Sequence, residues 1–182
     1  MTLLSIATSI DCNDSFHLSR LLVLIHVFAG KRDLDSLEGL TKLAKLDFLL
    51  RYPSYLERAL EARHTRASAA EVRDFERDSV ESAMVRFKYG PWDFRYRRFL
   101  NLLVGRGLVH ISLRGRTVLI AVTEKGKKLA TELESKEEFF DIVERSRLLK
   151  THFDLSASTL VKFVYDVFPE IGSLRYGAKI NK

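Results

Sequence analysis

Residues 108–126, LVHISLRGRTVLIAVTEKG, form the stretch that most limits how this chain can fold. Two apolar, β-branched runs flank the sequence RGR, a pattern typical of two antiparallel strands joined by a tight turn at Gly115. Thr123 follows the second run, and a threonine there can cap the first turn of a helix. The stretch therefore predicts a β-hairpin followed directly by a helix.

Helices are predicted on both sides of this hairpin, because apolar residues recur at helical spacing between capping and helix-breaking residues. Before the hairpin, helices are expected at 14–29 (Asp14 or Ser15 as cap, Gly30 as stop), 37–52, 54–63, 68–84 and 93–106. A short strand is expected at 85–90, where Gly90-Pro91 stops it. After the hairpin, helices are expected at 123–133, 136–152 and 156–168, followed by a loose tail.

Helix, hairpin and helix, preceded by further helices, is the order of a winged-helix domain, in which a three-helix core carries a two-stranded wing. We therefore expect a mainly α fold with an N-terminal helical region at 1–67, a winged-helix core at 68–134, and C-terminal helices and a tail at 135–182. The helix at 93–106, capped by Asp93, occupies the position that often enters the major groove of DNA.

Positive charge is concentrated in one segment of the chain. The formal net charge is +6, but residues 86–128 carry eleven Lys and Arg against two acids, so this window is +9 and the remainder is −3. Within it, RFKYGPWDFRYRRF holds six aromatic and five basic side chains in fourteen positions. A concentrated patch of this kind is typical of a surface that meets a polyanion or an acidic protein.

The basic side chains are expected on the exposed side of the helix at 93–106, at the wing tip and at the start of the next helix, because residues from Tyr96 to Val104 form an apolar stripe on the opposite side. The predicted face comprises Arg95, Arg98, Arg106, Arg114, Arg116, Lys125, Lys127 and Lys128. Three interpretations stay open: contact with the DNA backbone, a dock for an acidic protein, and a solvated face with surface ion pairs. No base sequence is specified, since Asn101 is the sole amide side chain of this helix.

Aromatic residues outside the basic face are candidates for a protein interface. Trp92 follows the tight turn at Gly90-Pro91, where it can either plug the core or anchor a partner. The C-terminal helices are apolar enough to dock on another chain, although they could equally cover this chain's own core. The interface candidates are Trp92, Phe139, Phe140, Phe163 and Phe168.

Signatures of catalysis are missing from the sequence. It contains no phosphate-binding glycine loop, zinc-protease motif or nucleophile elbow, and its histidines are scattered singly. Asp93 with Glu134 and Lys136 only weakly resembles the residue set of a nuclease metal site. A single cysteine excludes a cysteine-cluster metal site. We expect no catalytic residues, no metal and no cofactor.

A membrane location is not expected. The longest apolar run, residues 21–29, has nine residues, whereas a membrane-spanning helix needs about twenty. The N-terminus lacks a basic segment ahead of its apolar stretch, so it does not read as a signal peptide. These features favour the cytoplasm.

Three segments, KLAKLDFLLRYPSYLERAL, VRFKYGPWDFRYRRFLNLLVGRGLV and GRTVLIAVTEKGKKLA, resemble the middle component of prokaryotic ABC three-component systems, which include Lamassu-type anti-phage defence. The resemblance covers residues 37–133, and LDFLLRYP and YGPWD are its most specific elements. It implies a small non-catalytic subunit beside an SMC-like or Rad50-like ATPase and an effector, often a nuclease. It supplies no catalytic residues.

A homodimeric winged-helix transcription regulator is the competing hypothesis, with residues 93–106 reading a palindromic site. The N-terminal helices exceed what a minimal regulator needs, although they could form a dimer interface. The helix at 93–106 is also rich in arginine and poor in base-reading amides.

Overall fold

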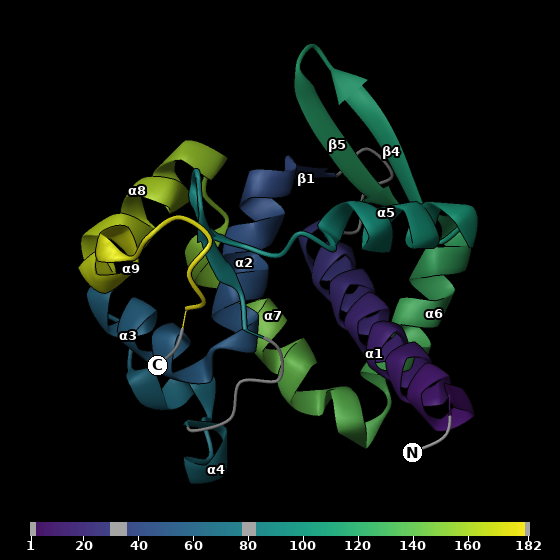
Figure 1. Cartoon of the computed structure of the whole chain (residues 1–182), viewed down its shortest axis with the longest axis horizontal. Coiled ribbons are helices and arrows are strands. Elements are labelled where there is room, and N and C mark those ends of the chain that lie inside the picture. Colours follow the sequence, from purple (N-terminus) through teal and green to yellow (C-terminus); the bar gives the residue numbers. More distant parts are fainter. Residues whose placement is uncertain (1–2, 30–35, 78–82, 181–182) are drawn as a thin grey trace.

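The computed structural model describes residues 3–29, 36–77 and 83–180, and within them the chain is mainly helical with small antiparallel sheets, as the sequence predicts (Figure 1). The longer helices are α1 (Leu3–Ala29), α2 (Leu40–Arg51), α3 (Pro53–Ala62), α5 (Tyr96–Gly105), α6 (Glu124–Glu134), α7 (Phe140–Phe153) and α8 (Ala157–Val167). The short helical turns are η1 (Ala67–Ala70), α4 (Asp74–Arg77), η2 (Glu137–Phe139) and α9 (Pro169–Ser173).

The predicted hairpin is confirmed as β4 (Val109–Arg114) and β5 (Thr117–Val122), and it projects from the helical body in Figure 1. Gly115 has a φ of +61°, the region that a tight hairpin turn requires and that glycine adopts without strain. Thr123 caps α6 as expected, because its Oγ1 accepts a hydrogen bond from the Gly126 amide at 3.0 Å.

A third strand joins this hairpin where the sequence predicted helix. Residues Leu37–Glu38 form β1, which pairs with β5 and gives the sheet order β1-β5-β4. The helix α2 begins only at Leu40, because Gly39 has a φ of +86° and its amide donates to the Val118 carbonyl at 2.8 Å. Pairing with β5 thus overrides the helical spacing of Leu37.

Helix α1 forms the centre of the fold. It begins at Leu3, so Asp14 lies inside the helix instead of capping it; the expected stop at Gly30 lies outside the described residues. The side chains of Leu21, Val23, Leu24 and Ile25 are fully buried around its whole circumference. Such a helix must be covered on all sides, and α1 packs against α5, α6, α7 and β5.

The helix predicted at 68–84 is wrong for the part of it that the structure describes. The chain instead forms the turns η1 and α4, separated by residues without regular structure, and residues 78–82 lie outside the described part. Glu71 ends η1 with a φ of +46°, which a continuing helix does not allow. Arg145 of α7 donates hydrogen bonds to the Ala70 and Glu71 carbonyls, so tertiary contacts hold this segment in place of helical ones.

The strand predicted at 85–90 is confirmed only for Val85–Phe87, which form β2. Gly90-Pro91 was expected to stop it but begins a partner strand, β3 (Gly90–Trp92), because the chain turns back at residues 88–89 and pairs with β2. The C-terminal residues, expected to be loose, lie beside β2. The Arg86 amide donates to the Ala178 carbonyl and the Gly177 amide donates to the Arg86 carbonyl, both at 2.8 Å. Ile180 is buried, so the tail up to that residue is part of the fold.

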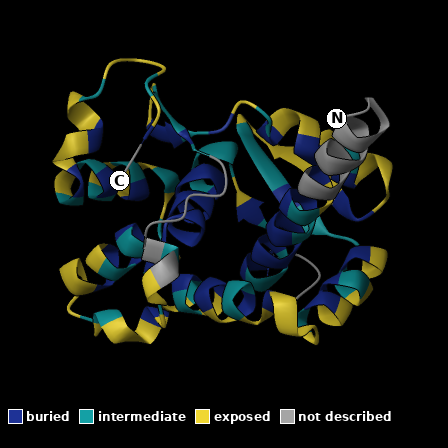
Figure 2. Ribbon diagram, turned by 60° about the horizontal axis from the view of Figure 1, so that its bottom comes forward, coloured by how far each residue is buried: buried dark blue, intermediate teal, exposed yellow. Residues whose placement is uncertain are grey.

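Buried apolar residues from α1, α2, α3, α5, α7 and α8 form one continuous core. Figure 2 shows these buried positions where the helices face one another, with exposed positions on their outer sides. Helix α5 lies across this core beside the β4–β5 hairpin, so its outer side and the hairpin share one region of the surface (Figure 1).

Candidate binding face around helix α5

Helix α5 has a narrow buried side and a broad exposed side. Tyr96, Phe99, Leu100 and Leu103 are buried at helical spacing against α1 and β4, as the sequence predicts. Val104 was expected in this stripe but is 41% exposed, because its position lies roughly a quarter turn around the helix from the middle of the stripe. The exposed side presents Arg97, Arg98, Asn101 and Arg106.

A buried carboxylate fixes the inner side of α5. Asp47 of α2 accepts hydrogen bonds from Arg20 Nε of α1 at 2.9 Å and from the Tyr96 hydroxyl of α5 at 2.7 Å, and Arg51 Nη1 lies 3.6 Å away. Burial alone would raise the pKa of Asp47, but Arg20 and Arg51 hold it below its usual value. One ionised carboxylate therefore joins α1, α2 and α5.

Asp93 continues this network towards the surface. Its carboxylate accepts from Arg51 Nη1 at 2.9 Å, Arg95 Nη2 at 2.8 Å and the Arg95 amide at 2.9 Å. Burial opposes ionisation, yet these donors hold the pKa of Asp93 well below its usual range. Asp93 was expected to cap α5, but the helix begins three residues later at Tyr96, and the carboxylate serves mainly as a partner for Arg51 and Arg95.

His17 of α1 completes the buried network. Its Nδ1 lies 2.8 Å from Arg20 Nη1, and its ring centroid lies 5.5 Å from that of Phe99. Burial, followed by the charge of Arg20, lowers the pKa of His17 to about 4, so the ring is neutral at pH 7. A neutral ring can accept a hydrogen bond from Arg20 Nη1, which satisfies one more donor of that buried guanidinium.

Four residues of the predicted basic face are engaged with carboxylates of this chain. Arg95 bonds Asp93 and also lies over the Phe99 ring, 5.2 Å from its centroid. Arg98 forms an ion pair with Asp14, and Arg114 forms one with Glu38. The fourth, Lys127, pairs with Glu124 at 2.7 Å.

The other four predicted residues are exposed. Arg106, Arg116 and Lys128 make no ion pair with another described residue, and Lys125 Nζ donates to the Arg106 carbonyl at 2.9 Å. Arg106 follows the end of α5 and Lys125 lies in the first turn of α6, so the two residues lie next to each other at the base of the β4–β5 hairpin. Arg116 lies in the hairpin turn. These residues border α5 at its C-terminal end and at the hairpin tip.

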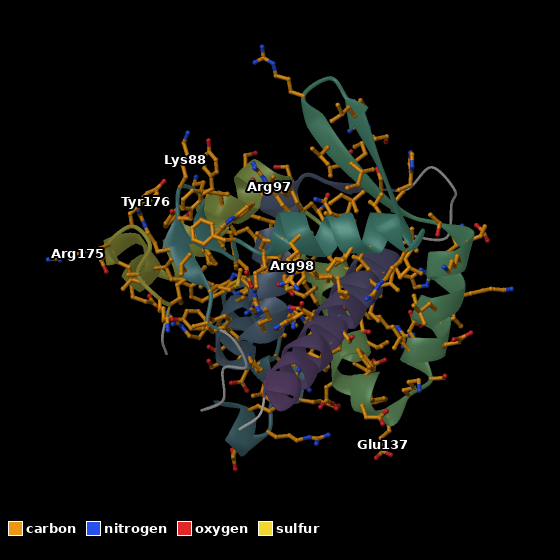
Figure 3. All side chains as sticks on the ribbon, turned by 45° about the vertical axis from the view of Figure 1, so that its right-hand side comes forward. Lys88, Arg97, Arg98, Glu137, Arg175 and Tyr176 are labelled. Atoms are coloured by element: carbon orange, nitrogen blue, oxygen red, sulfur yellow. The ribbon has the colours of Figure 1, made fainter. Side chains whose placement is uncertain are left out.

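Three further exposed cations were left out of the sequence-based face. In Figure 3, Lys88 lies on the side from which the hairpin projects, Arg97 lies over α5, and Arg175 lies beside Tyr176 at the lateral edge of the molecule, whereas Arg98 is turned towards α1. None of the three forms an ion pair with a described residue. Arg97 and Lys88 belong to the basic segment noted in the sequence, but the position of Arg175 depends on the return of the tail to β2.

The aromatic interface candidates differ in exposure. Phe168 is fully buried between Phe48 and Tyr55, and Phe139 is buried against Phe16, so both are part of this chain's own core. Phe163 is half-buried against Phe153, and Phe140 is 54% exposed. Trp92 is half-buried, with its ring centroid 5.4 Å from that of Tyr96 and 6.2 Å from that of Phe87.

The acidic residues considered for metal binding have other partners. Asp93 bonds Arg51 and Arg95, while Glu134 lies 3.0 Å from Arg147 and 3.6 Å from His26. Among the described residues, no group of three or more His, Cys, Asp and Glu side chains is placed to hold a metal ion. The helices within the described ranges also include none with the length and apolar character needed to span a bilayer.

The geometry thus joins a fixed inner side of α5 to an outer side bordered by exposed cations. Comparison with protein-family models, curated proteins and solved structures found no match to this chain.

Proposed function

We propose that this chain is a non-catalytic accessory subunit of a cytoplasmic anti-phage defence complex, in which it works beside an SMC-like or Rad50-like ATPase and an effector. Its resemblance over residues 37–133 to the middle component of ABC three-component systems supports these partners. The exposed cations around α5 support a role in contacting DNA or an acidic surface of the complex.

A winged-helix unit is the proposed framework for this role. The sequence-based boundaries placed the core at 68–134; in this proposal helices α1 and α2 of the N-terminal region join α5 as the three-helix core, and β4–β5 would be its wing. The contacts of α1 with both α2 and α5, and the pairing of β1 with β5, support this assignment. Residues 53–92 would then be an insertion between the second and third helices of the unit.

The observation that carries the proposal is the unequal use of cations on the two sides of α5. Arg20 and Arg51 are buried and bound to carboxylates, whereas Arg97, Arg106 and Arg116 are exposed without an ion pair among the described residues. An exposed arginine whose guanidinium is free of carboxylates suits the phosphate oxygens of DNA.

A homodimeric transcription regulator is the second candidate. It is favoured by the position of α5 directly before the hairpin, with Asn101 and Arg97 on its exposed side. Asparagine and arginine are side chains that read adenine and guanine in the major groove.

Co-purification of the tagged chain from its own host, with partners identified by mass and quantified, separates the two candidates. Recovery of a long coiled-coil ATPase and an effector in fixed proportion supports the accessory subunit. A homodimer that carries one specific DNA sequence, without an ATPase, would refute it.

Charge reversal tests whether the face around α5 contributes. The double variant Arg97→Glu, Arg116→Glu should reduce recovery of the complex or its retention on DNA, because it places repulsive charge on the proposed contact. Lys162→Glu with Arg66→Glu is the matched control, since both side chains are exposed and the change in charge is the same; α8, which carries Lys162, packs against α2, α3, α9 and β3, and Arg66 lies between α3 and η1. Equal recovery of both variants would remove the face from the proposal.

A further inference from the structure

Three aromatic side chains are exposed at or next to the β2–β3 hairpin: Tyr89 lies in its turn, Phe94 follows β3, and Tyr176 comes from the tail beside β2. Phe94 is 63% exposed, Tyr176 is 57% exposed and Tyr89 is 51% exposed. The half-buried Phe87 lies between two of them, with its ring centroid 5.3 Å from that of Phe94 and 5.4 Å from that of Tyr176. Together with Trp92 beneath Phe87, they form what we call the aromatic platform.

Because these rings are exposed, the isolated chain lacks the stabilising free energy that their burial in the core would contribute. Covering a side chain the size of phenylalanine contributes on the order of 1.5–3 kcal/mol, and most of that is forgone at Phe94. Single exposed aromatics need no explanation, but here the exposed rings of two distant chain segments surround one further ring. The cluster therefore has the character of a binding surface.

Cations lie beside the aromatic platform, and the two chain segments that form it contain few carboxylates. The guanidinium of Arg86 lies 4.9 Å from the Tyr176 ring centroid, and Lys88 Nζ lies 5.4 Å from that of Tyr89. Arg97 and Arg175 are also exposed, and Figure 3 shows Arg175 next to Tyr176 and Arg97 over α5. The sequences 84–98 and 174–180 contain one acid, Asp93, and it is buried against Arg51 and Arg95.

The platform is held in place before any ligand arrives. Both the amide and the carbonyl of Arg86 in β2 form hydrogen bonds with the tail. Gly177 adopts a φ of +79°, which lets the chain turn back there. From the opposite side, the buried Lys45 of α2 donates to the Pro91 carbonyl of β3 at 2.9 Å. Fixed rings lose little conformational entropy when a planar group stacks on them.

We propose that the aromatic platform binds single-stranded nucleic acid, with bases stacked on Phe94, Tyr176 and Tyr89 and phosphates neutralised by Lys88, Arg97 and Arg175. Stacking needs the open face of an unpaired base, whereas a duplex offers only base edges along its grooves. Alternating aromatic and basic side chains without nearby carboxylates are the chemistry of single-strand binding surfaces. This site adjoins the α5 face, with which it shares Arg97, and its test does not depend on the proposed complex.

Titration of the purified full-length chain tests this directly, because the sole tryptophan, Trp92, lies beneath the platform and reports on stacking by fluorescence. The probes are an oligothymidylate and an oligouridylate of about 20 nucleotides and a duplex of the same length. We expect a single strand to quench Trp92 and to bind more tightly than the duplex. The two single-stranded probes then distinguish DNA from RNA.

Substitutions separate stacking from general charge attraction. Phe94→Ala and Tyr176→Ala should each weaken single-strand binding by roughly fivefold or more. Lys88→Gln with Arg175→Gln should flatten its salt dependence by about 0.7 for each phosphate that is no longer neutralised. Tyr176→Phe keeps the ring and should retain binding, and Phe140→Ala removes an exposed ring elsewhere and should have no effect.

Two results would overturn the proposal. One is the absence of quenching with either single strand, which would leave the platform to a protein partner. The other is an equal loss of single-strand and duplex affinity in the aromatic variants. Melting curves establish whether each variant is folded. If an alanine variant does not fold, the salt dependence of the Lys88→Gln, Arg175→Gln variant still tests the proposal, with Tyr176→Phe as its control. Failure here would leave the co-purification test of the complex unaffected.

Discussion

Beneath helix α5, Arg20 and Arg51 reach Asp47, and Arg51 also reaches Asp93; on the outer side, Arg97 and Arg106 meet no carboxylate among the described residues. Both sides of the helix carry arginine, so burial, and not residue type, determines which arginines are paired with carboxylates. A charge taken out of water needs an opposite charge and hydrogen bonds, whereas an exposed one is satisfied by solvent.

The inner and outer cations around α5 therefore have different roles. The inner set positions α5 against α1 and α2, because each carboxylate is bound from more than one element. The outer set contributes little to stability and remains available for a ligand. Substitutions on the inner side should therefore change unfolding, and substitutions on the outer side should change binding.

The largest effect is expected for Asp47→Ala. It removes the carboxylate that Arg20, Arg51 and Tyr96 share, so buried cations lose their counter-charge. The free energy of unfolding should fall by about 3–5 kcal/mol, measured by urea denaturation. Arg97→Gln on the outer side should change it by less than about 0.5 kcal/mol. A similar change in the free energy of unfolding for the two variants would show that the inner and outer sides do not differ in their contribution to stability.

Lys45 extends the comparison to a buried cation without a carboxylate partner among the residues described. Its Nζ donates to the Pro91 carbonyl, and burial lowers its pKa from 10.5 to about 7. Between these two pH values the unfolded chain binds the lysine proton and the folded chain does not, so this group makes stability rise with pH and its penalty is largest below pH 7.

Relative to Lys45→Met, the wild type should gain about 2 kcal/mol of stability between pH 7 and pH 9. Urea denaturation of both proteins across this range measures the gain, and the difference cancels the titration of other groups. A gap between the two proteins that does not vary with pH would show that Lys45 keeps its proton in the folded chain.

Trp92 lies at the boundary between the inner and outer sides, since its ring meets buried Tyr96 and half-buried Phe87. Trp92→Ala should remove part of a packed contact and cost about 2 kcal/mol. Because each kcal/mol shifts the melting temperature of a chain of this size by about 2–4 °C, the melting temperature should fall by about 4–8 °C. Trp92→Phe should recover much of this loss. An isolated chain that melts normally would instead make Trp92 an anchor for a partner.

The smallest effects are expected for single arginines in binding to duplex DNA. Arg97→Gln and Arg116→Gln should each reduce the slope of log affinity against log salt by about 0.9 if each contacts one phosphate. Arg98→Gln should reduce it less, because Arg98 is already paired with Asp14. Equal slopes for all three variants and the wild type would make this face a solvated surface.

The sequence alone determined features whose causes lie within a few residues. Strand alternation and Gly115 produce the β4–β5 hairpin, Thr123 starts α6, and the apolar spacing from Tyr96 to Leu103 predicts the buried side of α5. Local hydrogen bonding and backbone preference are sufficient there. The concentration of basic and aromatic residues at 86–99 is also visible in the sequence, although their exposure is not.

Tertiary structure alone decided which partners meet across long stretches of the chain. Arg20 and Asp47 are 27 residues apart, Arg51 and Asp93 are 42 apart, and Arg98 and Asp14 are 84 apart. The tail similarly reaches β2 from the far end of the chain and completes the aromatic platform with Tyr176. No local pattern encodes such pairings, because they form only once the apolar core has brought the helices together.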